Sequence, residues 1–190
     1  MTSPRSIDAQ AWIDAGLAEL GQGGIDGVRV EVLAQRLGVT KGGFYRRFRD
    51  RQALHEAMLD AWARGRIAVI QRQTELGSET ARERLRAVIR LFAERPNPQG
   101  LSIELAIRQW ARGDARAAEA VLRVDAARLE AVGGLYAKLG FPPAQAQARA
   151  VLFYAFIFGQ GLLFLDSSPR RREAMIEACT DALVDVGGAV

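Results

Sequence analysis

The segment GVTKGGFYRRF, residues 38–48, places three cations, three aromatic rings and two adjacent glycines in one short stretch. Lysine and arginine can neutralise phosphate oxygens, and arginine can also hydrogen-bond to the edge of a guanine. A glycine has no side chain, so a backbone N–H group there can come close to a phosphate. These residue types therefore suit contact with a polyanion.

The positive charge of the chain is concentrated around this segment. From Arg29 to Arg51 there are seven basic residues and two acidic ones, Glu31 and Asp50, an excess of five. The whole chain of 190 residues has a net charge of only +4. A local basic patch indicates a polyanionic partner better than the total charge does.

Two short helices are expected on either side of the sequence LGVT, with Gly38 ending the first and Thr40 capping the second. This is the length and turn of a helix-turn-helix, whose second helix enters the major groove of DNA. Phe44 and Phe48 lie one turn apart on the same face, so we assign both to the core. Tyr45 can then donate its hydroxyl to a phosphate.

Arg46 or Arg47 is expected to reach a guanine edge or the DNA backbone, and Lys41 to add a point charge near phosphate. A basic segment beside aromatic residues can also be a solvated face over a core stripe. The pattern alone leaves both interpretations open.

Strand signals are nearly absent from the rest of the chain, and apolar residues recur at helical spacing. We predict an all-α fold of about nine helices, with a break at GQGGIDG, residues 21–27, and another at LGSET, residues 76–80. The helices are expected at about residues 7–20, 28–37, 40–48, 50–75, 80–94, 100–112, 114–140, 142–165 and 169–186.

The helix expected from Pro142 is apolar on all sides. One face of this helix carries Leu152 and the small residues Ala148, Ala155 and Gly159. The small side chains would let another helix come close. Such a helix is buried on several sides, in a deep core or against a partner. The apolar run at 151–165 is shorter than the roughly 20 residues that a bilayer span needs, so we predict no membrane segment.

The sequence offers little for catalysis or metal binding. Its only histidine is His55, expected on the surface, and its only cysteine is Cys179, expected on the inner side of the last helix. No metal site, disulfide or Ser-His-acid set is predicted from one of each, and no cofactor is expected. The first residues lack the apolar core of a signal peptide, so we expect a cytoplasmic protein.

The stretch GGIDGVRVEVLAQRLGVTKGGFYRRFRDRQAL, residues 23–54, resembles the N-terminal domain of the tetracycline-repressor (TetR) family of transcriptional regulators. The match covers about residues 10–65, and its TKGGFY..F part is specific. Residues 80–190 resemble the family only loosely. The matching positions are Gly24, Leu33, Ala34, Leu37, Gly38, Val39, Thr40, Lys41, Gly42, Phe44, Tyr45, Phe48, Asp50 and Leu54.

The resemblance, together with the bare backbone at the two glycines, implies a set of DNA contacts. Position 43 is often serine, threonine or alanine in the family, so its glycine forfeits a side-chain contact. Arg29 stands where small hydroxyl residues are common, and it contacts phosphate or a base or is merely exposed. The expected contacts are Arg29, Thr40, Lys41, Gly42, Gly43, Tyr45, Arg46 and Arg47.

The resemblance also implies a helix-turn-helix domain at residues 1–52, joined by the helix from 51 to a ligand-binding and dimerisation domain at 53–190. A homodimer built from the last two helices would read a palindromic operator in double-stranded DNA. Candidate effector contacts, for each of which ordinary core packing is the alternative, are Trp62, Phe92, Ile103, Ile107, Arg108, Trp110, Tyr136, Phe153 and Tyr154.

Arg108 has two interpretations, because it can hold an acidic ligand or pair with Glu104 one turn back. The function predicted for the whole chain is a ligand-responsive transcriptional regulator, more often a repressor in this family, released from DNA by a small molecule. Two alternatives remain at this stage: an all-α enzyme whose basic helix is incidental, and a helical adaptor that binds protein.

Overall fold

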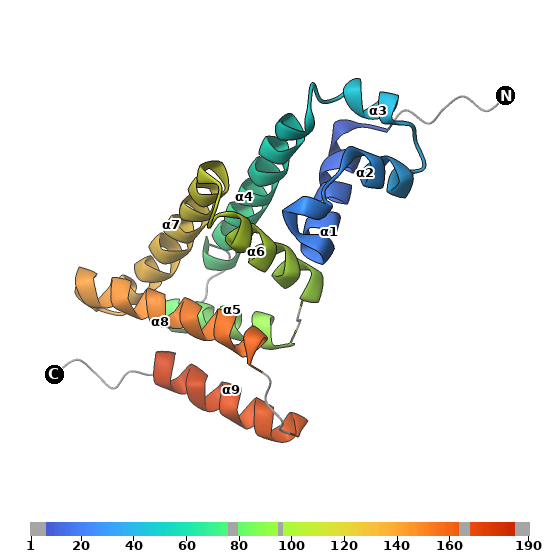
Figure 1. The fold of residues 1–190 in the computed structure, drawn as a ribbon. Coiled ribbons are helices and arrows are strands. Elements are labelled where there is room, and N and C mark those ends of the chain that lie inside the picture. The colour runs from blue at the N-terminus through green and yellow to red at the C-terminus, as the bar shows by residue number, and fades with distance from the viewer. Residues whose placement is uncertain (1–6, 76–79, 95–96, 164–167, 185–190) are drawn as a thin grey trace. The chain divides into compact units, whose positions relative to one another are not determined.

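The computed structural model describes residues 7–75, 80–94, 97–163 and 168–184. Over these residues the chain forms nine helices and no strand, which confirms the predicted all-α fold (Figure 1). The helices are α1 (Ala9–Gly27), α2 (Val30–Leu37), α3 (Lys41–Tyr45), α4 (Arg51–Glu75), α5 (Ala81–Glu94), α6 (Pro98–Trp110), α7 (Ala115–Lys138), α8 (Pro143–Leu162) and α9 (Pro169–Val184).

The chain divides into two compact units. Unit 1 contains residues 1–66 and 98–124, and unit 2 contains residues 67–97 and 125–190. Two long helices, α4 and α7, each contribute to both units along the chain. The boundary expected at residue 52 from the family resemblance stays a prediction.

The first predicted break was placed too early, because α1 continues through Gly21 and Gly23 as a helix. Only Gly24 leaves the helical conformation, with φ 67° and ψ −174°. Glycines earlier in α1 allow close packing: a Cβ at Gly16 would lie 2.6 Å from Met58 Sδ, and one at Gly21 would lie 3.0 Å from Ile103 Cγ1. These glycines therefore let α4 and α6 approach α1.

Two further details of unit 1 come from the structure. Helix α6 begins at Pro98, two residues before the expected start at about residue 100, and proline suits a first helical position because it has no N–H to leave unpaired. Leu122 of α7 is 69% exposed, although it is a large apolar residue. Positions on the other side of α7, Ala120 and Val124, are buried in its place.

One buried carboxylate in unit 1 has two arginine partners. Glu104 is 2% exposed and accepts a hydrogen bond from Arg108 Nε at 2.9 Å, and its other oxygen lies 3.6 Å from Arg66 Nε. Burying a carboxylate without such partners would be strongly unfavourable. The pairing of Arg108 with Glu104, one of the two interpretations, is thus what the structure shows.

Unit 2 has its own core, built where α5, α7, α8 and α9 contribute apolar residues. Tyr136 is fully buried, and its hydroxyl donates to the carbonyl of Leu183 at 3.1 Å. In α9, three residues are half-buried: Ile176, Cys179 and Leu183. The expected end of this helix, at Val186, lies outside the described residues. The buried cluster is Leu85, Val88, Ile89, Val132, Leu135, Tyr136, Ala146, Ala150, Phe153, Tyr154, Ile157 and Val184.

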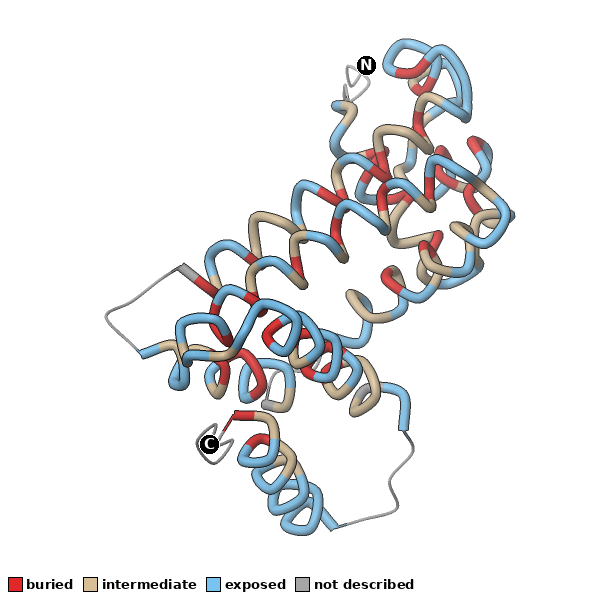
Figure 2. Tube along the Cα trace, turned by 90° about the vertical axis from the view of Figure 1, so that its left-hand side faces the viewer, coloured by how far each residue is buried: buried red, intermediate tan, exposed pale blue. Residues whose placement is uncertain are grey.

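Helix α8 buries one side and exposes the other, as the alternation of colours along the long helices illustrates in Figure 2. Phe153 and Ile157 belong to the core, whereas Val151 is 51% and Leu152 is 59% exposed. Ala148 and Ala155 are exposed beside them. Within the described part of the chain, no helix combines the length and apolar character that a bilayer crossing requires.

Candidate nucleic-acid interface

The turn between α2 and α3 has the geometry expected for a helix-turn-helix. Gly38 adopts the left-handed conformation, with φ 67° and ψ 32°, and its N–H bonds to carbonyls of α2. The N–H of Val39 donates to the carbonyl of Ala34 at 2.9 Å. A side chain at Gly38 would meet no atom within 4 Å, so the glycine is required by its backbone conformation rather than by space.

Helix α3 is shorter than expected and is capped differently. It covers Lys41–Tyr45, and Arg46 and Arg47 follow in a turn. Thr40 stands at the N-cap with extended backbone, but its side chain makes no capping hydrogen bond. A helix of this length is not stable alone, so its position depends on contacts with the rest of unit 1.

Those contacts are made by aromatic rings, as predicted for Phe44 and Phe48. Phe44 is fully buried, and its ring stacks on Phe48 at 5.4 Å between centroids. It also meets Trp12 of α1 edge-on at 5.3 Å. Phe44 therefore joins α3 to the centre of unit 1.

The opposite side of α3 faces solvent. Tyr45 is 61% exposed, and its ring meets Phe44 edge-on at 5.2 Å. Gly43 is half-buried. The other predicted DNA contacts are exposed: Arg29, Thr40, Lys41, Gly42, Arg46 and Arg47.

The exposed cations differ in their contacts within the chain. Across the residues that the structure describes, the side chains of Arg29 and Arg46 make no ion pair or hydrogen bond. Arg47 Nε donates to the carbonyl of Ile7 at 3.1 Å, and Lys41 Nζ lies 2.6 Å from Glu31 Oε1. Arg49 pairs with its neighbour Asp50 at 3.1 Å.

Asp50 also starts the long helix that follows, as predicted from the sequence. Its Oδ1 accepts a hydrogen bond from the N–H of Ala53 at 2.8 Å. A capping aspartate of this kind satisfies an otherwise unpaired N–H at the helix start. The charge of Asp50 is thereby used locally, and Arg46 stays available to an external anion.

The predicted effector contacts fall in both units. Trp62, Ile107, Arg108 and Trp110 belong to unit 1, where the first two are buried and Ile103 is half-buried. In unit 2, Phe92 is 40% exposed, while three residues belong to the core cluster: Tyr136, Phe153 and Tyr154. These positions remain candidates for ligand contact.

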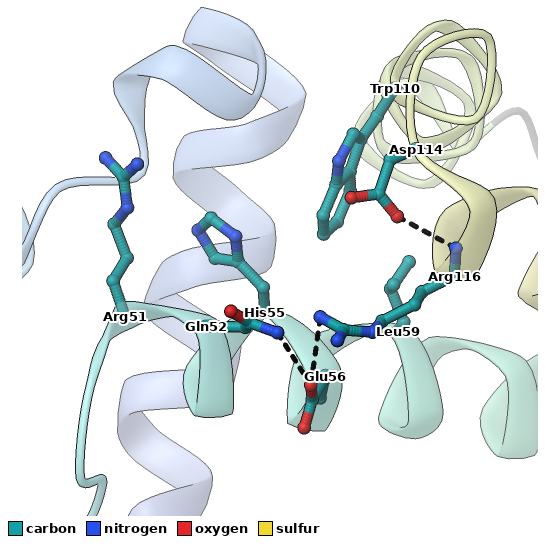
Figure 3. Close-up of a pocket in the computed structure, with 8 residues that line it drawn as sticks. All are labelled: Arg51, Gln52, His55, Glu56, Leu59, Trp110, Asp114 and Arg116. Atoms are coloured by element: carbon teal, nitrogen blue, oxygen red, sulfur yellow. Dashed lines mark hydrogen bonds and ion pairs between the residues drawn. The ribbon is translucent and has the colours of Figure 1, made fainter.

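A pocket of about 220 Å³ in unit 1 contains one of these candidates, Trp110, and a residue that the sequence interpretation had misplaced (Figure 3). His55 was expected on the surface but is half-buried, with its ring edge-on to Trp110 at 5.2 Å. Burial, helped by the charge of Arg51, lowers the pKa of His55, and Asp114 opposes this in part. The imidazole is therefore mainly neutral near pH 7.

Four charged residues also line this pocket, and one of them, Arg116, is linked to two of the others. Arg116 contacts Glu56 at 3.1 Å, and its backbone N–H donates to Asp114 at 2.9 Å. One part of the environment of His55 could have been found from the sequence, because His55 lies one turn after Arg51 on α4. Its partner Trp110 lies 55 positions later on α6, beyond any local pattern.

A second pocket, in unit 2, lies between α5 and α9 and has a volume of about 470 Å³. Ile89 and Ile176 form its apolar wall, and Arg86 is engaged there with Asp181 at 2.6 Å. None of the predicted effector residues lines it. Among the described residues, no group of three or more potential metal ligands was found.

Comparison with known proteins agrees with this geometry. Residues 13–58 match the sequence model of the bacterial regulatory proteins of the tetR family. This region contains α2, α3 and the buried rings Phe44 and Phe48, as well as every predicted DNA contact. No curated protein sequence matches the chain significantly.

Solved structures share the fold over nearly the whole chain. A TetR-family transcriptional regulator from Rhodococcus sp. superposes with a TM-score of 0.71 at 23% identity, covering 93% of this chain and 98% of the other. A transcriptional regulator from Saccharomonospora viridis in complex with choline gives a TM-score of 0.76 at 14% identity, covering 94% and 96%. E. coli NemR in its reduced form gives 0.73 at 16% identity, covering 95% and 99%.

The family match lies on the helices that expose the basic surface, and the similar structures extend the same fold over both units. Residues 13–58 therefore match the tetR family of bacterial regulatory proteins, and the chain shares its fold with solved structures of TetR-family transcriptional regulators.

Proposed function

We propose that this protein is a ligand-responsive repressor that binds a palindromic operator as a homodimer and leaves it when a small molecule binds. The observation that supports DNA contact most directly is the two-sided character of α3. Phe44 of α3 and Phe48 just after it are buried, while Tyr45 of α3 and Arg46 in the following turn are exposed. This arrangement presents the leading edge of α3 to a major groove.

The proposed contacts have separate roles. Arg46 has no partner among the described side chains and is the best placed to reach a guanine or a phosphate. Arg29, Lys41 and Arg47 supply charge for phosphates, and Tyr45 supplies a hydroxyl. Thr40, Gly42 and Gly43 contribute backbone and small groups at the start of α3.

The proposed dimer rests on the exposed side of α8. Val151 and Leu152 are both more than half exposed in the single chain, and the small residues Ala148 and Ala155 stand beside them. Aliphatic side chains on a surface of this kind favour a helix of a second copy. A two-fold dimer would place two α3 helices about 34 Å apart, one turn of DNA.

The proposed effector acts by population shift. A small molecule held in the part of the chain after α3 would favour a dimer in which the two α3 helices no longer match successive grooves. Trp110 is the candidate contact that lines a pocket, and one structure with the same fold was solved with choline bound. Because the protein would act on DNA, we expect it to be in the cytoplasm.

Binding of purified protein to the DNA upstream of its own gene tests this function. Fluorescence anisotropy over a series of salt concentrations should show a complex whose affinity falls steeply as salt rises. Arg46→Ala should weaken it by about 1–3 kcal/mol if Arg46 makes a bidentate base contact, or flatten the salt slope by about one if it contacts phosphate.

Arg64→Ala is the matched control, because Arg64 is an exposed arginine on α4 outside the proposed contact surface. It should bind like the wild type. A wild type that forms no salt-sensitive complex would contradict the proposal. Equal and measurable affinities of the Arg46 and Arg64 variants would show that Arg46 does not contact the DNA. Negligible affinity that neither substitution changes would favour a protein-binding adaptor.

A further inference from the structure

One of the proposed phosphate contacts is already occupied by an acid of the same unit. Lys41 is the first residue of α3, and its Nζ lies 2.6 Å from Glu31 Oε1 in the first turn of α2. The two side chains are 57% and 60% exposed. The ion pair therefore stands on the outer surface of the helix-turn-helix, where DNA phosphates can compete for the lysine.

The ion pair contributes little to the fold. Exposed ion pairs are usually worth little, because water screens them and two long side chains lose freedom. The junction of α2 and α3 is held mainly by other contacts, including buried Leu33, buried Phe44 and the bond from Val39 N–H to Ala34. Glu31 is thus not needed to hold the two helices together.

The charge of Glu31 persists at neutral pH. The hydrogen bond from Lys41 lowers the pKa of Glu31 below its usual value, and the charge of Arg29 acts in the same direction. The other acid of the basic window, Asp50, is engaged with Ala53 N–H and Arg49. When Lys41 turns to a phosphate, Glu31 is left as an ionised carboxylate beside a polyanion.

We propose that Glu31 competes with DNA phosphate for Lys41 and so sets how strongly the protein binds duplex DNA of any sequence. This inference rests on the proposed DNA binding. Sequence-independent binding comes almost entirely from phosphate neutralisation. One cation withheld by Glu31 therefore reduces this binding directly. Base contacts made by Arg46 are not affected in the same way.

Glu31→Gln tests the proposal with a labelled duplex of mixed sequence of about 30 base pairs, long enough for one dimer on two half-sites. Affinity should rise roughly two- to fivefold, the range expected for an exposed ion pair. The slope of log affinity against log salt should become steeper by about one, because one more phosphate is neutralised.

Glu130→Gln is the matched control: it removes the same charge from an exposed position of α7 in unit 2. It should leave the salt slope unchanged. Adding Glu31→Gln to a Lys41→Gln protein should then raise affinity no more than Glu130→Gln does. Thermal unfolding of each variant verifies that the fold is intact.

Three results would overturn the role of Glu31: unchanged binding by Glu31→Gln, weaker binding by it, or a full gain that persists without Lys41. The last would show that Glu31 repels DNA without acting through the lysine. A wild type that binds no duplex at all overturns the proposed function itself, whereas a wild type that binds as well as its Glu31→Gln variant overturns only this inference.

Discussion

The outer surface of α3 in unit 1 and the outer surface of α8 in unit 2 each stand opposite a buried aromatic side. On its buried side, α3 packs Phe44 against Trp12 of α1. On its buried side, α8 contributes Phe153 to the core of unit 2. The exposed sides differ in kind, since α3 presents Arg46 among cations and α8 presents Leu152 among aliphatic residues. Both exposed surfaces therefore carry side chains that do not pack into the core of their own unit.

The difference indicates two kinds of partner. An exposed arginine loses little by remaining in water, but gains charge-assisted hydrogen bonds when an anion arrives. Exposed aliphatic residues gain by leaving water, and a protein surface offers that. In the function proposed above, the same helical construction serves a polyanion in one unit and a second copy in the other.

The largest expected effect breaks the support of α3. Phe44→Ala should destabilise unit 1 by about 3–5 kcal/mol, because a fully buried ring with three aromatic neighbours is lost. Denaturant unfolding measures it, with the exposed neighbour variant Tyr45→Ala as control. A loss no larger than that of Tyr45→Ala would show that the ring does not anchor α3.

The next effect breaks the surface of α8. Leu152→Glu should raise the dissociation constant of the dimer at least about tenfold, because a charge would be buried between two helices. Analytical ultracentrifugation over a concentration series measures it. Leu122→Glu is the matched control, since Leu122 is 69% exposed in unit 1. Identical behaviour of the two variants would place the dimer contact elsewhere.

A pH titration tests the core of unit 2, which contains two buried tyrosines. Burial raises the pKa of Tyr136 and Tyr154 to about 12. An unfolded tyrosine ionises near pH 10, so the unfolded chain loses these protons first and stability falls as pH rises from about 10 towards 12.

The expected loss is up to about 2 kcal/mol per tyrosine, measured by denaturant unfolding at pH 9 and near pH 12. Tyr154→Phe should remove part of it, since phenylalanine does not ionise. A variant with the same loss between these pH values as the wild type would contradict the assignment to Tyr154.

The smallest effects distinguish two glycines around α3. Gly38→Ala should destabilise by about 1–2 kcal/mol, because φ is 67° there. Gly43→Ala should stabilise by about 0.5–1 kcal/mol, because position 43 is helical and a Cβ would make only ordinary contacts, with Trp12 at 3.8 Å and Val39 at 3.9 Å. Thermal unfolding compares them, and shifts of the same sign would refute this reading of the turn.

Much of the helix-turn-helix could be predicted from sequence because its signals are local. Gly38, the Phe44–Phe48 spacing and the Asp50 cap each act within one or two turns, and the structure agrees at all three. The identity of the DNA contacts stays a prediction, although the structure shows that Arg46 is exposed.

The errors arose where distant residues decide burial. His55 was expected on the surface but is half-buried, because Trp110 of α6 packs against it. The early glycines of α1 permit close packing against Met58 and Ile103, which no local pattern could distinguish from a break.

The sequence by itself determined the helices, the buried rings of α3 and the concentration of positive charge between Arg29 and Arg51. Hydrophobic periodicity and capping act between residues close in the chain, so they can be recognised without a fold. Only the tertiary structure decided which charges are already paired. Lys41 meets Glu31, and Arg47 meets Ile7, because folding brings separate segments together.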